Sequence, residues 1–353
     1  MKLLKYIALL LLLLVFYFTF KSTPIDPIAY TPPVPIPMEG LLSPNTLLSS
    51  AEILAEGKIN GPEAIAIDTA GVIFTGTADG NITKVFPDGR VEPFINTGGR
   101  PLGMKFDSSG NLIVCDSWKG LLSISMDGKV TTLTNSADNI PFAFTDDLDI
   151  ASDGTIYFTD ASSKFHQPEY LYDLLESKPH GRFLKYDPRT KETTVLLNGL
   201  YFPNGVALSQ REDFVLINET YRYRITRFYL KGDKKGTSDI FFENAPGFPD
   251  NITSNRRGVF YVAFFTVRNP LLDSIQPHPH LTKFISKLPK FFWPRPKPYG
   301  FVMSLDENGN ILASYQEPKG KHLKEITSAL EYNGYLYLGS LHNDRIGKLA
   351  LKK

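Results

Sequence analysis

Short apolar stretches separated by glycine-containing turns recur along most of the chain, starting at Gly61. The first copy reads AIAID, VIFTG, NITKVF and RVEPFI, and the second reads GMKFD, NLIVC, LLSIS and KVTTL, with turns such as TADG, PDG and MDG between stretches. Alternating apolar runs joined by such turns are typical of antiparallel hairpins. Each copy therefore predicts one four-stranded antiparallel sheet.

Six segments begin a copy in the same way: PEAIAID, PLGMKFD, TDDLDIA, FPNGVAL, FPDNIT and ITSALEY. This repeat predicts an all-β, six-bladed β-propeller. The last copy is too short for a fourth strand, so we expect residues 50–57 (SAEILAEG) to complete it and to remove the open sheet edges. A β-sandwich or two smaller β domains is the alternative, which the sixfold register disfavours.

Two copies carry long insertions, at residues 161–181 and 265–300. Both fall between the second and third strands of a blade, a connection that returns to the face where the inner strands begin. We expect the two insertions to form a helical lid over that face.

The N-terminus departs from the rest of the chain, because Leu3 to Phe20 is an almost unbroken apolar stretch of about 18 residues, close to the roughly 20 that cross a bilayer as a helix. We expect a transmembrane signal-anchor over residues 1–21. A cleaved signal peptide is the alternative, but no small-x-small cleavage pattern follows Phe20. Lys2 and Lys5 precede the stretch and favour an N-terminus that stays in the cytoplasm.

The resulting organisation is a single-pass membrane protein with its propeller on the extracytoplasmic side. Residues 22–45 are rich in proline, and we expect an extended stem that holds the globular domain off the membrane. Residues 46–353 form the predicted propeller with its two insertions.

Overall charge points to no nucleic-acid partner, because 38 basic residues are balanced by 37 acidic residues, for a formal net charge of +1. The single cysteine, Cys115, cannot form an intrachain disulfide and lies in an apolar strand, where we interpret it as a buried residue without a chemical role.

The insertion at residues 265–300 mixes aromatic residues such as Phe291, Phe292 and Trp293 with several lysines and arginines. Basic residues beside tryptophan and phenylalanine are typical of an interfacial membrane contact. The alternative is a lid whose apolar side packs on the propeller while its lysines are solvated. The sequence leaves both interpretations open.

The six repeated segments share one equivalent position, where most of the residues carry a side-chain oxygen: Glu63, Leu102, Asp146, Asn204, Asp250 and Thr327. Blades arranged around an axis bring equivalent positions together. Three carboxylates would then repel one another unless a hard cation lies among them. The sequence therefore predicts a calcium ion on the axis.

The motifs GPEAIAID, FTGTADGNITKV, RPLGMKFD, FPNGVALS and PGFPDNIT resemble those of the strictosidine-synthase-like propellers, over nearly the whole chain. The pattern is more distantly similar to paraoxonases and to the gluconolactonase and senescence-marker group, which hold calcium in a central channel through Glu, Asn, Asn and Asp. The resemblance implies a metal site made of Glu63, Asp146, Asn204 and Asp250 with Asn251. Asp146 stands where Asn is usual, and its added negative charge is expected to tighten cation binding.

The catalytic residues of these relatives do not carry over. The histidine pair of paraoxonases falls on Leu102 and Ser117, and the glutamate of strictosidine synthase falls near Thr327 and Ser328. Neither mechanism is therefore intact.

Other residues on the same face remain as candidates for catalysis. Asp250 or Asp146 is a candidate base or nucleophile, with His166 and His342 on surrounding loops as proton carriers. A surface histidine is more often incidental, and that interpretation stays open.

The candidate substrate pocket is aromatic. Trp118, Tyr221 and Tyr223 are expected to line it together with Leu102 and Thr327, although aromatic residues in such loops also serve to pack a lid.

The function predicted from these features is calcium-dependent hydrolysis of lactones or aryl esters with a small hydrophobic substrate. The protein is expected to contact the membrane through its N-terminal anchor. The insertion at residues 265–300 would be a second contact if its aromatic and basic residues form an interfacial membrane contact. One alternative is a non-catalytic binding or adhesion propeller that calcium only stabilises. Another is carbon–nitrogen bond formation as in strictosidine synthase, which the missing glutamate disfavours.

Overall fold

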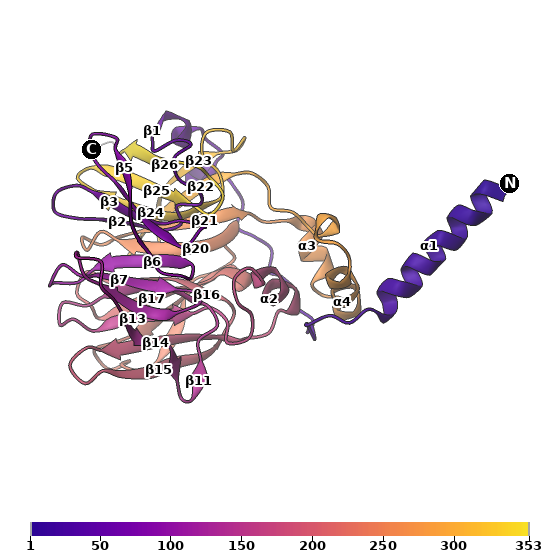
Figure 1. Ribbon diagram of the computed structural model, residues 1–353, viewed down its shortest axis with the longest axis horizontal. Helices are drawn as coiled ribbons and strands as arrows, with labels where there is room; N and C mark the ends of the chain where they lie inside the picture. Colours follow the sequence, from indigo (N-terminus) through magenta and orange to yellow (C-terminus); the bar gives the residue numbers. More distant parts are fainter. Residues whose placement is uncertain (1, 352–353) are drawn as a thin grey trace.

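The computed structural model describes residues 2–351, apart from the side chains of residues 2–4, 8, 10, 11 and 13–15. Six four-stranded sheets are arranged around a common axis, and helices lie on one side of them, next to a long N-terminal helix (Figure 1). Neighbouring strands within every sheet are antiparallel. The predicted six-bladed propeller is confirmed.

Blades one to five are each built from four strands that follow one another along the chain. Blades one to three contain β2 (Ile65–Ile67), β3 (Ile73–Gly76), β4 (Asn81–Val85), β5 (Val91–Asn96), β6 (Pro101–Phe106), β7 (Leu112–Asp116), β8 (Gly120–Ile124), β9 (Val130–Thr134), β12 (Thr145–Ile150), β13 (Ile156–Asp160), β14 (Gly181–Asp187) and β15 (Glu192–Leu200). Blades four and five contain β16 (Pro203–Leu208), β17 (Phe214–Glu219), β18 (Arg224–Tyr229), β19 (Ser238–Phe242), β20 (Gly247–Ser254), β21 (Val259–Val267), β22 (Gly300–Asp306) and β23 (Ile311–Glu317). A small hairpin, β10 (Ser136–Ala137) with β11 (Ile140–Pro141), lies between blades two and three in the sequence.

The sixth blade joins the two ends of the propeller. It contains β24 (Ile326–Tyr332), β25 (Tyr335–Ser340) and β26 (Ile346–Ala350), and its outer strand is β1 (Glu52–Leu54), which pairs antiparallel with β26. As predicted, the segment before the first blade supplies the missing strand.

The first strands of the blades contact one another in a closed ring, in the order β2, β6, β12, β16, β20, β24 and back to β2. In β6, β12, β16, β20 and β24 the pairing register shifts within the first few residues. Such bulges change the direction in which a side chain points. The repeated polar positions fall in these irregular stretches, which turns them toward the axis.

Glycines let neighbouring blades approach closely at these bulges. A Cβ atom on Gly205 would lie 2.2 Å from the backbone nitrogen of Ile252 in the next blade, and one on Gly339 would lie 2.4 Å from the backbone oxygen of Glu63. Since these contacts are with backbone atoms, no side chain can move aside to make room. The two positions therefore tolerate only glycine without a shift between blades.

We predict that Gly205→Ala lowers the free energy of unfolding by about 1–3 kcal/mol, because the added methyl group overlaps the adjacent strand. Urea denaturation followed by tryptophan fluorescence measures the change. Gly57→Ala is the matched control, since a Cβ there meets open space and only its positive φ of 70° opposes the change. Equal losses in the two variants would show that the blades do not interlock at Gly205.

The two insertions form helices on one side of the propeller, as expected. They contain α2 (Tyr170–Glu176), α3 (Pro270–Ile275) and α4 (Pro279–Lys287). The side chain of Asn269 caps α3 by accepting hydrogen bonds from two backbone N–H groups of its first turn. Trp293 fixes the end of the second insertion, because it is buried, its ring contacts Tyr172, and its indole N–H donates to the backbone oxygen of Leu288.

The N-terminal residues form α1 (Lys2–Phe20), which projects away from the propeller (Figure 1). No helix within the described residues combines the length and apolar character needed to cross a bilayer. The transmembrane anchor predicted over residues 1–21 is therefore not confirmed, and it rests in part on side chains outside those described.

Residues 22–38, the first part of the stem predicted over residues 22–45, contain no helix or strand and contact the insertions. The segment lies along the lid and is bound to it through its backbone: Ile28 N–H donates to the oxygen of Glu176, and Tyr30 N–H donates to that of Gln276. The side chain of Arg222 stacks on the Tyr30 ring, 3.8 Å from its centroid. We call residues 22–38 the strap, because they tie α1 to the lid.

Glu176 is the main polar contact between the strap and the lid. Its buried carboxylate accepts hydrogen bonds from the side chains of Lys164 and His180, both at 2.6 Å, and from the backbone N–H of Asp26 at 2.7 Å. Burial alone would raise the pKa of Glu176, but the hydrogen bonds from His180, Lys164 and Asp26 lower it to about 2. The ionised form is therefore strongly favoured in the folded protein.

We predict that this carboxylate makes stability depend on pH in the acidic range. The pKa of Glu176 is lower in the folded protein than in the unfolded chain, so its ionised form stabilises the fold above about pH 4.5. This contribution to the free energy of unfolding, roughly 3 kcal/mol, is lost as the pH falls toward 2. Denaturant unfolding between pH 2 and 6 should show a flatter pH profile for Glu176→Gln than for the unmodified chain. Glu169→Gln, a change at an exposed position of the same insertion, should keep the original slope.

Candidate metal centre and pocket

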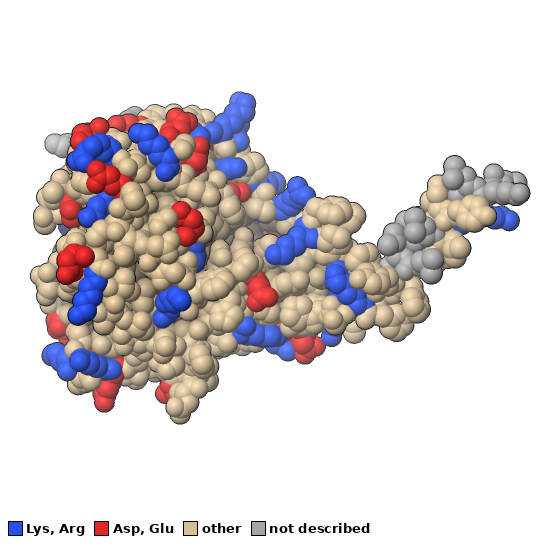
Figure 2. Space-filling view, viewed as in Figure 1, with Lys and Arg blue, Asp and Glu red and all other residues tan. Residues whose placement is uncertain are grey.

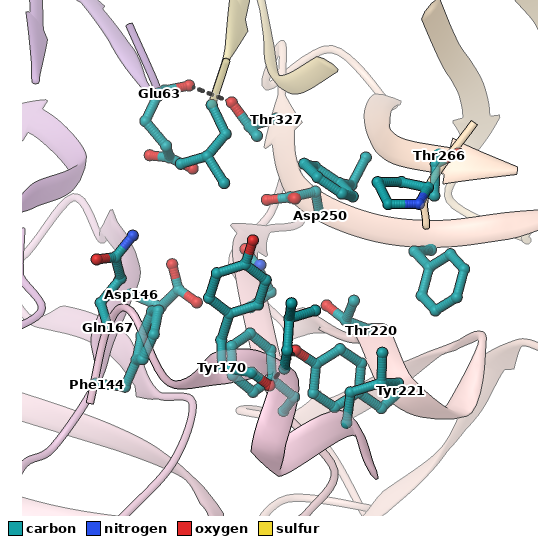
Figure 3. A pocket seen from close by; sticks show the side chains of 18 of the residues that line it. Glu63, Phe144, Asp146, Gln167, Tyr170, Thr220, Tyr221, Asp250, Thr266 and Thr327 are labelled. Atoms are coloured by element: carbon teal, nitrogen blue, oxygen red, sulfur yellow. Dashed lines mark hydrogen bonds between the residues drawn. The ribbon is translucent and has the colours of Figure 1, made fainter. Parts of the chain in front are cut away.

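The polar residues predicted to lie on the axis do meet there. Glu63 lies just before β2, separated from it by Ala64, while Asp146 lies on β12, Asn204 on β16, and Asp250 and Asn251 on β20. All five are buried. Figure 3 shows the carboxylates of Asp146 and Asp250 near one space, with Glu63 on its other side.

Four side-chain oxygens at this place are buried without a hydrogen-bond partner among the described residues. They are Oε2 of Glu63, Oδ2 of Asp146, Oδ1 of Asn204 and Oδ1 of Asn251. An unpartnered buried acceptor costs about 1–3 kcal/mol, and more when it is charged. A cation bound among these oxygens would remove that cost.

Hydrogen bonds orient the amide and backbone groups around the axis. The Nδ2 of Asn251 donates to Oε1 of Glu63 at 3.0 Å, which leaves the amide oxygen of Asn251 free. The hydroxyl of Thr327 donates to the backbone oxygen of Glu63 at 2.7 Å (Figure 3). The Nδ2 of Asn218 donates to the backbone oxygen of Asp250 at 2.5 Å. The side-chain nitrogens of Asn251 and Asn218 thus hold Glu63 and Asp250 in position.

Burial raises the pKa values of the carboxylates on the axis, and repulsion adds to the shift at the two aspartates. Burial raises the pKa of Glu63 to about 7, although Arg100 and Asn251 oppose the shift. Burial, with repulsion from Glu63, holds the pKa values of Asp146 and Asp250 well above their usual range. The site therefore disfavours negative charge unless a positive ion accompanies it.

The donor set suits a hard cation. Within the described residues, no three His, Cys, Asp or Glu side chains are grouped so that they could hold a metal ion by themselves. The set on the axis instead mixes carboxylates with the amide oxygens of Asn204 and Asn251. Calcium accepts this combination, whereas transition metals prefer histidine and cysteine.

A cavity of about 110 Å³ opens above these residues on the lid side. Its walls are mainly apolar and come from both the blades and the insertions. Besides Glu63, Asp146, Asn204 and Asp250, it is lined by Leu102, Phe144, Gln167, Tyr170, Leu171, Leu174, Phe202, Thr220, Tyr221, Phe248, Phe265, Thr266, Asn269, Leu272, Pro294, Arg295, Pro296, Thr327 and Leu341. The lid is thus part of the pocket wall.

Three of the five residues predicted for the substrate pocket, Leu102, Tyr221 and Thr327, line this cavity. The other two do not. Tyr223 is fully buried beneath Arg268, and its hydroxyl donates to Asp273 at 3.3 Å. Trp118 lies in the turn between β7 and β8 with 58% of its surface exposed.

The predicted proton carriers also lie outside the pocket. None of the described residues that line it is a histidine. His342 follows the lining residue Leu341, but its Nδ1 is bound to Oε2 of Glu325 at 2.8 Å. His166 is exposed and precedes the lining residue Gln167. Asp146 and Asp250, the two carboxylates predicted to act in catalysis, do line the pocket.

Sequence reasoning missed a second repeated set of polar residues, at the ends of the second strands of blades two to four. Asp116, Asp160 and Glu219 are completely buried and bind nearby backbone or arginine groups. Asp160 and Arg182, for example, form two hydrogen bonds. The runs LIVCD, IYFTD and VLINE carry the signal, since each apolar strand ends in an acid. These acids fix the loops between strands, and Asn218, beside Glu219, binds the Asp250 backbone.

Comparisons with known proteins agree with this architecture. A family model described as "Strictosidine synthase" matches residues 146–233, and one described as "Strictosidine synthase-like, N-terminal" matches residues 40–85. The chain is 40% identical to adipocyte plasma membrane-associated protein from Rattus norvegicus over 358 residues, covering 94% of each protein. The chain belongs to the strictosidine synthase-like family.

Other relatives extend the comparison. Protein STRICTOSIDINE SYNTHASE-LIKE 6 from Arabidopsis thaliana is 38% identical over 314 residues, covering 87% of this chain and 83% of the relative. Among solved structures, a gluconolactonase from Xanthomonas campestris superimposes with a TM-score of 0.64 at 17% identity, covering 94% of this chain and 99% of that one. A calcium-binding protein, regucalcin, from Agrobacterium tumefaciens superimposes with a TM-score of 0.63 at 12% identity, covering 86% and 94%. At such low identity these structures show that the fold is shared.

Proposed function

We propose that this member of the strictosidine synthase-like family is a calcium-dependent hydrolase of lactones or aryl esters with a hydrophobic substrate. The observation that supports it most is the group of four unpartnered buried oxygens, from Glu63, Asp146, Asn204 and Asn251, at the base of an apolar pocket. These residues would hold the ion, and Asp250 lies beside them. A bound calcium ion supplies positive charge that polarises a carbonyl group.

The chain's own residues account for binding and for exclusion of water. Phe144, Phe202 and Phe248 from the blades face the pocket together with Tyr170 and Leu174 from α2. Such walls favour the apolar part of a substrate and leave the carboxylates at the base as the polar end. Lactones and aryl esters with a hydrophobic substituent combine such an apolar part with a polar carbonyl group.

A carboxylate is the group best placed to take a proton from water. Asp250 lines the pocket, which places its carboxylate where it can take a proton from a water molecule beside the substrate. We assign it the role of general base. Asp146, whose Oδ2 is among the unpartnered oxygens, is assigned to the metal.

Carbon–nitrogen bond formation is less well supported. In this chain Thr327 and Ser328 occupy the place that corresponds to the catalytic glutamate of strictosidine synthase. Both hydroxyls donate to the backbone oxygen of Glu63, at 2.7 and 2.8 Å, and so stabilise the junction between the last and first blades. No carboxylate stands at those two positions to act on an amine.

We also propose that the protein is associated with a membrane through its N-terminal segment. Two features support this: α1 carries exposed apolar side chains, including Leu12, Phe16 and Phe20, and a relative with 40% identity is named a plasma membrane-associated protein.

Calcium is expected to stabilise the fold. Ligand at 100 times its Kd adds about 2.7 kcal/mol to the free energy of unfolding. Thermal unfolding should therefore shift upward when calcium is added to chelated protein, and Asp146→Asn should weaken calcium binding about tenfold or more, because one negative charge is lost while an oxygen donor remains. Asp233→Asn, at an exposed position, serves as the control. An unchanged melting temperature with calcium would contradict the proposed ion.

Hydrolysis of a panel of lactones and aryl esters tests the activity. We expect turnover with calcium, loss of turnover after chelation, and a decrease of about 100-fold or more in kcat for Asp250→Asn, because the general base is removed. Asp233→Asn should leave kcat unchanged. Stabilisation by calcium without turnover on any substrate would instead favour the non-catalytic binding propeller.

A further inference from the structure

The lid carries an exposed aromatic pair that packs against nothing in the core. Phe291 and Phe292 lie in the short helix η4 (Lys290–Phe292), each with 61% of its surface exposed, and their ring centroids are 4.1 Å apart. They are not on a loose loop, because the next residue, Trp293, is buried against α2 and hydrogen-bonded to Leu288. The structure thus holds two phenylalanines in solvent on a fixed turn.

The surroundings of this pair are strongly basic. We define the lid tip as residues 281–297, which include Lys283, Lys287, Lys290, Arg295 and Lys297 and no acidic residue. The one acid of the insertion, Asp273, lies outside the tip and is already bound to Arg268 at 2.9 Å. Figure 2 shows basic side chains in blue in the region between the propeller and α1.

The lid tip also touches the apolar N-terminal helix. Lys21 Nζ donates to the backbone oxygen of Lys287 at 3.0 Å, Lys287 Nζ donates to that of Thr19, and the hydroxyls of Thr23 and Ser286 are 2.8 Å apart. The strap holds these contacts in place. The exposed Phe16, Tyr17 and Phe20 of α1 therefore continue the apolar surface of the tip.

We propose that the lid tip and the end of α1 form one surface that docks on a bilayer containing anionic lipids. Phe291 and Phe292 enter the head-group region, and Lys290 and Lys297 lie near the lipid phosphates. Exposed aromatic residues next to lysines on a short element are suited to this boundary. A protein partner or a second copy fits less well, because protein interfaces are depleted in lysine.

Docking would place the pocket beside the lipid. Pro294, Arg295 and Pro296 belong both to the lid tip and to the pocket wall, so the opening of the pocket would lie next to the bilayer surface. Apolar substrates would then enter from the membrane. This last step rests on the proposed hydrolase activity, whereas the docking rests only on the proposed membrane association of the N-terminal segment.

A fluorescent label on the lid tip of the chain with its N-terminal helix α1 tests the docking without any substrate. The only native cysteine, Cys115, is fully buried, so Lys290→Cys can be labelled selectively with an environment-sensitive fluorophore. The labelled protein is reconstituted into vesicles of phosphatidylcholine and phosphatidylserine whose acyl chains are brominated. We expect quenching at least about twofold stronger than for a label at Tyr335→Cys, which lies in the β24–β25 hairpin.

Two comparisons make the result specific. The double variant Phe291→Ser, Phe292→Ser should reduce the quenching of the lid-tip label to the level of the Tyr335→Cys label. The control double variant Met126→Ser, Ile240→Ser, which changes exposed apolar residues on the blades, should leave the quenching unchanged. Vesicles without phosphatidylserine should give weaker quenching. A lid-tip label that is no more quenched than the Tyr335→Cys label in fully reconstituted protein would overturn the proposal, as would crosslinking of two copies through the tip. Neither outcome would bear on hydrolysis, which is measured separately.

Discussion

The arrangement of oxygen atoms on the propeller axis is the constraint on which the rest of the structure depends. Carboxylates and amides taken out of water raise the free energy of the folded chain unless something positive compensates them. Here the cost is concentrated in one place, where Glu63, Asp146 and Asp250 converge and where burial, together with the charge of Glu63 beside the two aspartates, raises the pKa values. Bulges at the start of the inner strands and the glycines opposite them bring these groups together. The backbone is therefore adapted to bring unpartnered side-chain oxygens together on the axis.

The repeat allowed the propeller and the axial residues to be predicted from the sequence, because equivalent positions in a closed ring must meet whatever the loops do. Asp146 and Asn204 could be found in this way without any knowledge of side-chain contacts. Trp118 and Tyr223 could not be placed, since the direction of a loop side chain depends on packing that does not repeat. Trp118 is at a turn and points into solvent, and Tyr223 is covered by Arg268.

Contacts between distant parts of the chain were also beyond prediction. The proline-rich segment indicates an extended conformation, but not what it lies against. Its position depends on Glu176, which is 150 residues away from Asp26 and hidden in a helix of the first insertion. In the same way, helices were expected in the insertions. Which of their residues line the pocket could not be predicted, because it depends on how α2 and the tip of the second insertion lie over the axis.

The pairing of β1 with β26 makes the propeller a ring that the chain can close only after all six blades have been synthesised. Residues 346–350 form the last strand of the propeller, and until they pair with residues 52–54 the sixth sheet lacks its outer strand. A partly made chain therefore exposes an unpaired sheet edge, which invites association with other chains. Because β1 follows the strap, η1 (Gly40–Leu42) and η2 (Leu47–Ser50) in the sequence, completing the ring also fixes the C-terminal end of the segment that carries the strap. A change that removes β26 would thus disturb the segment at the other end of the propeller as well.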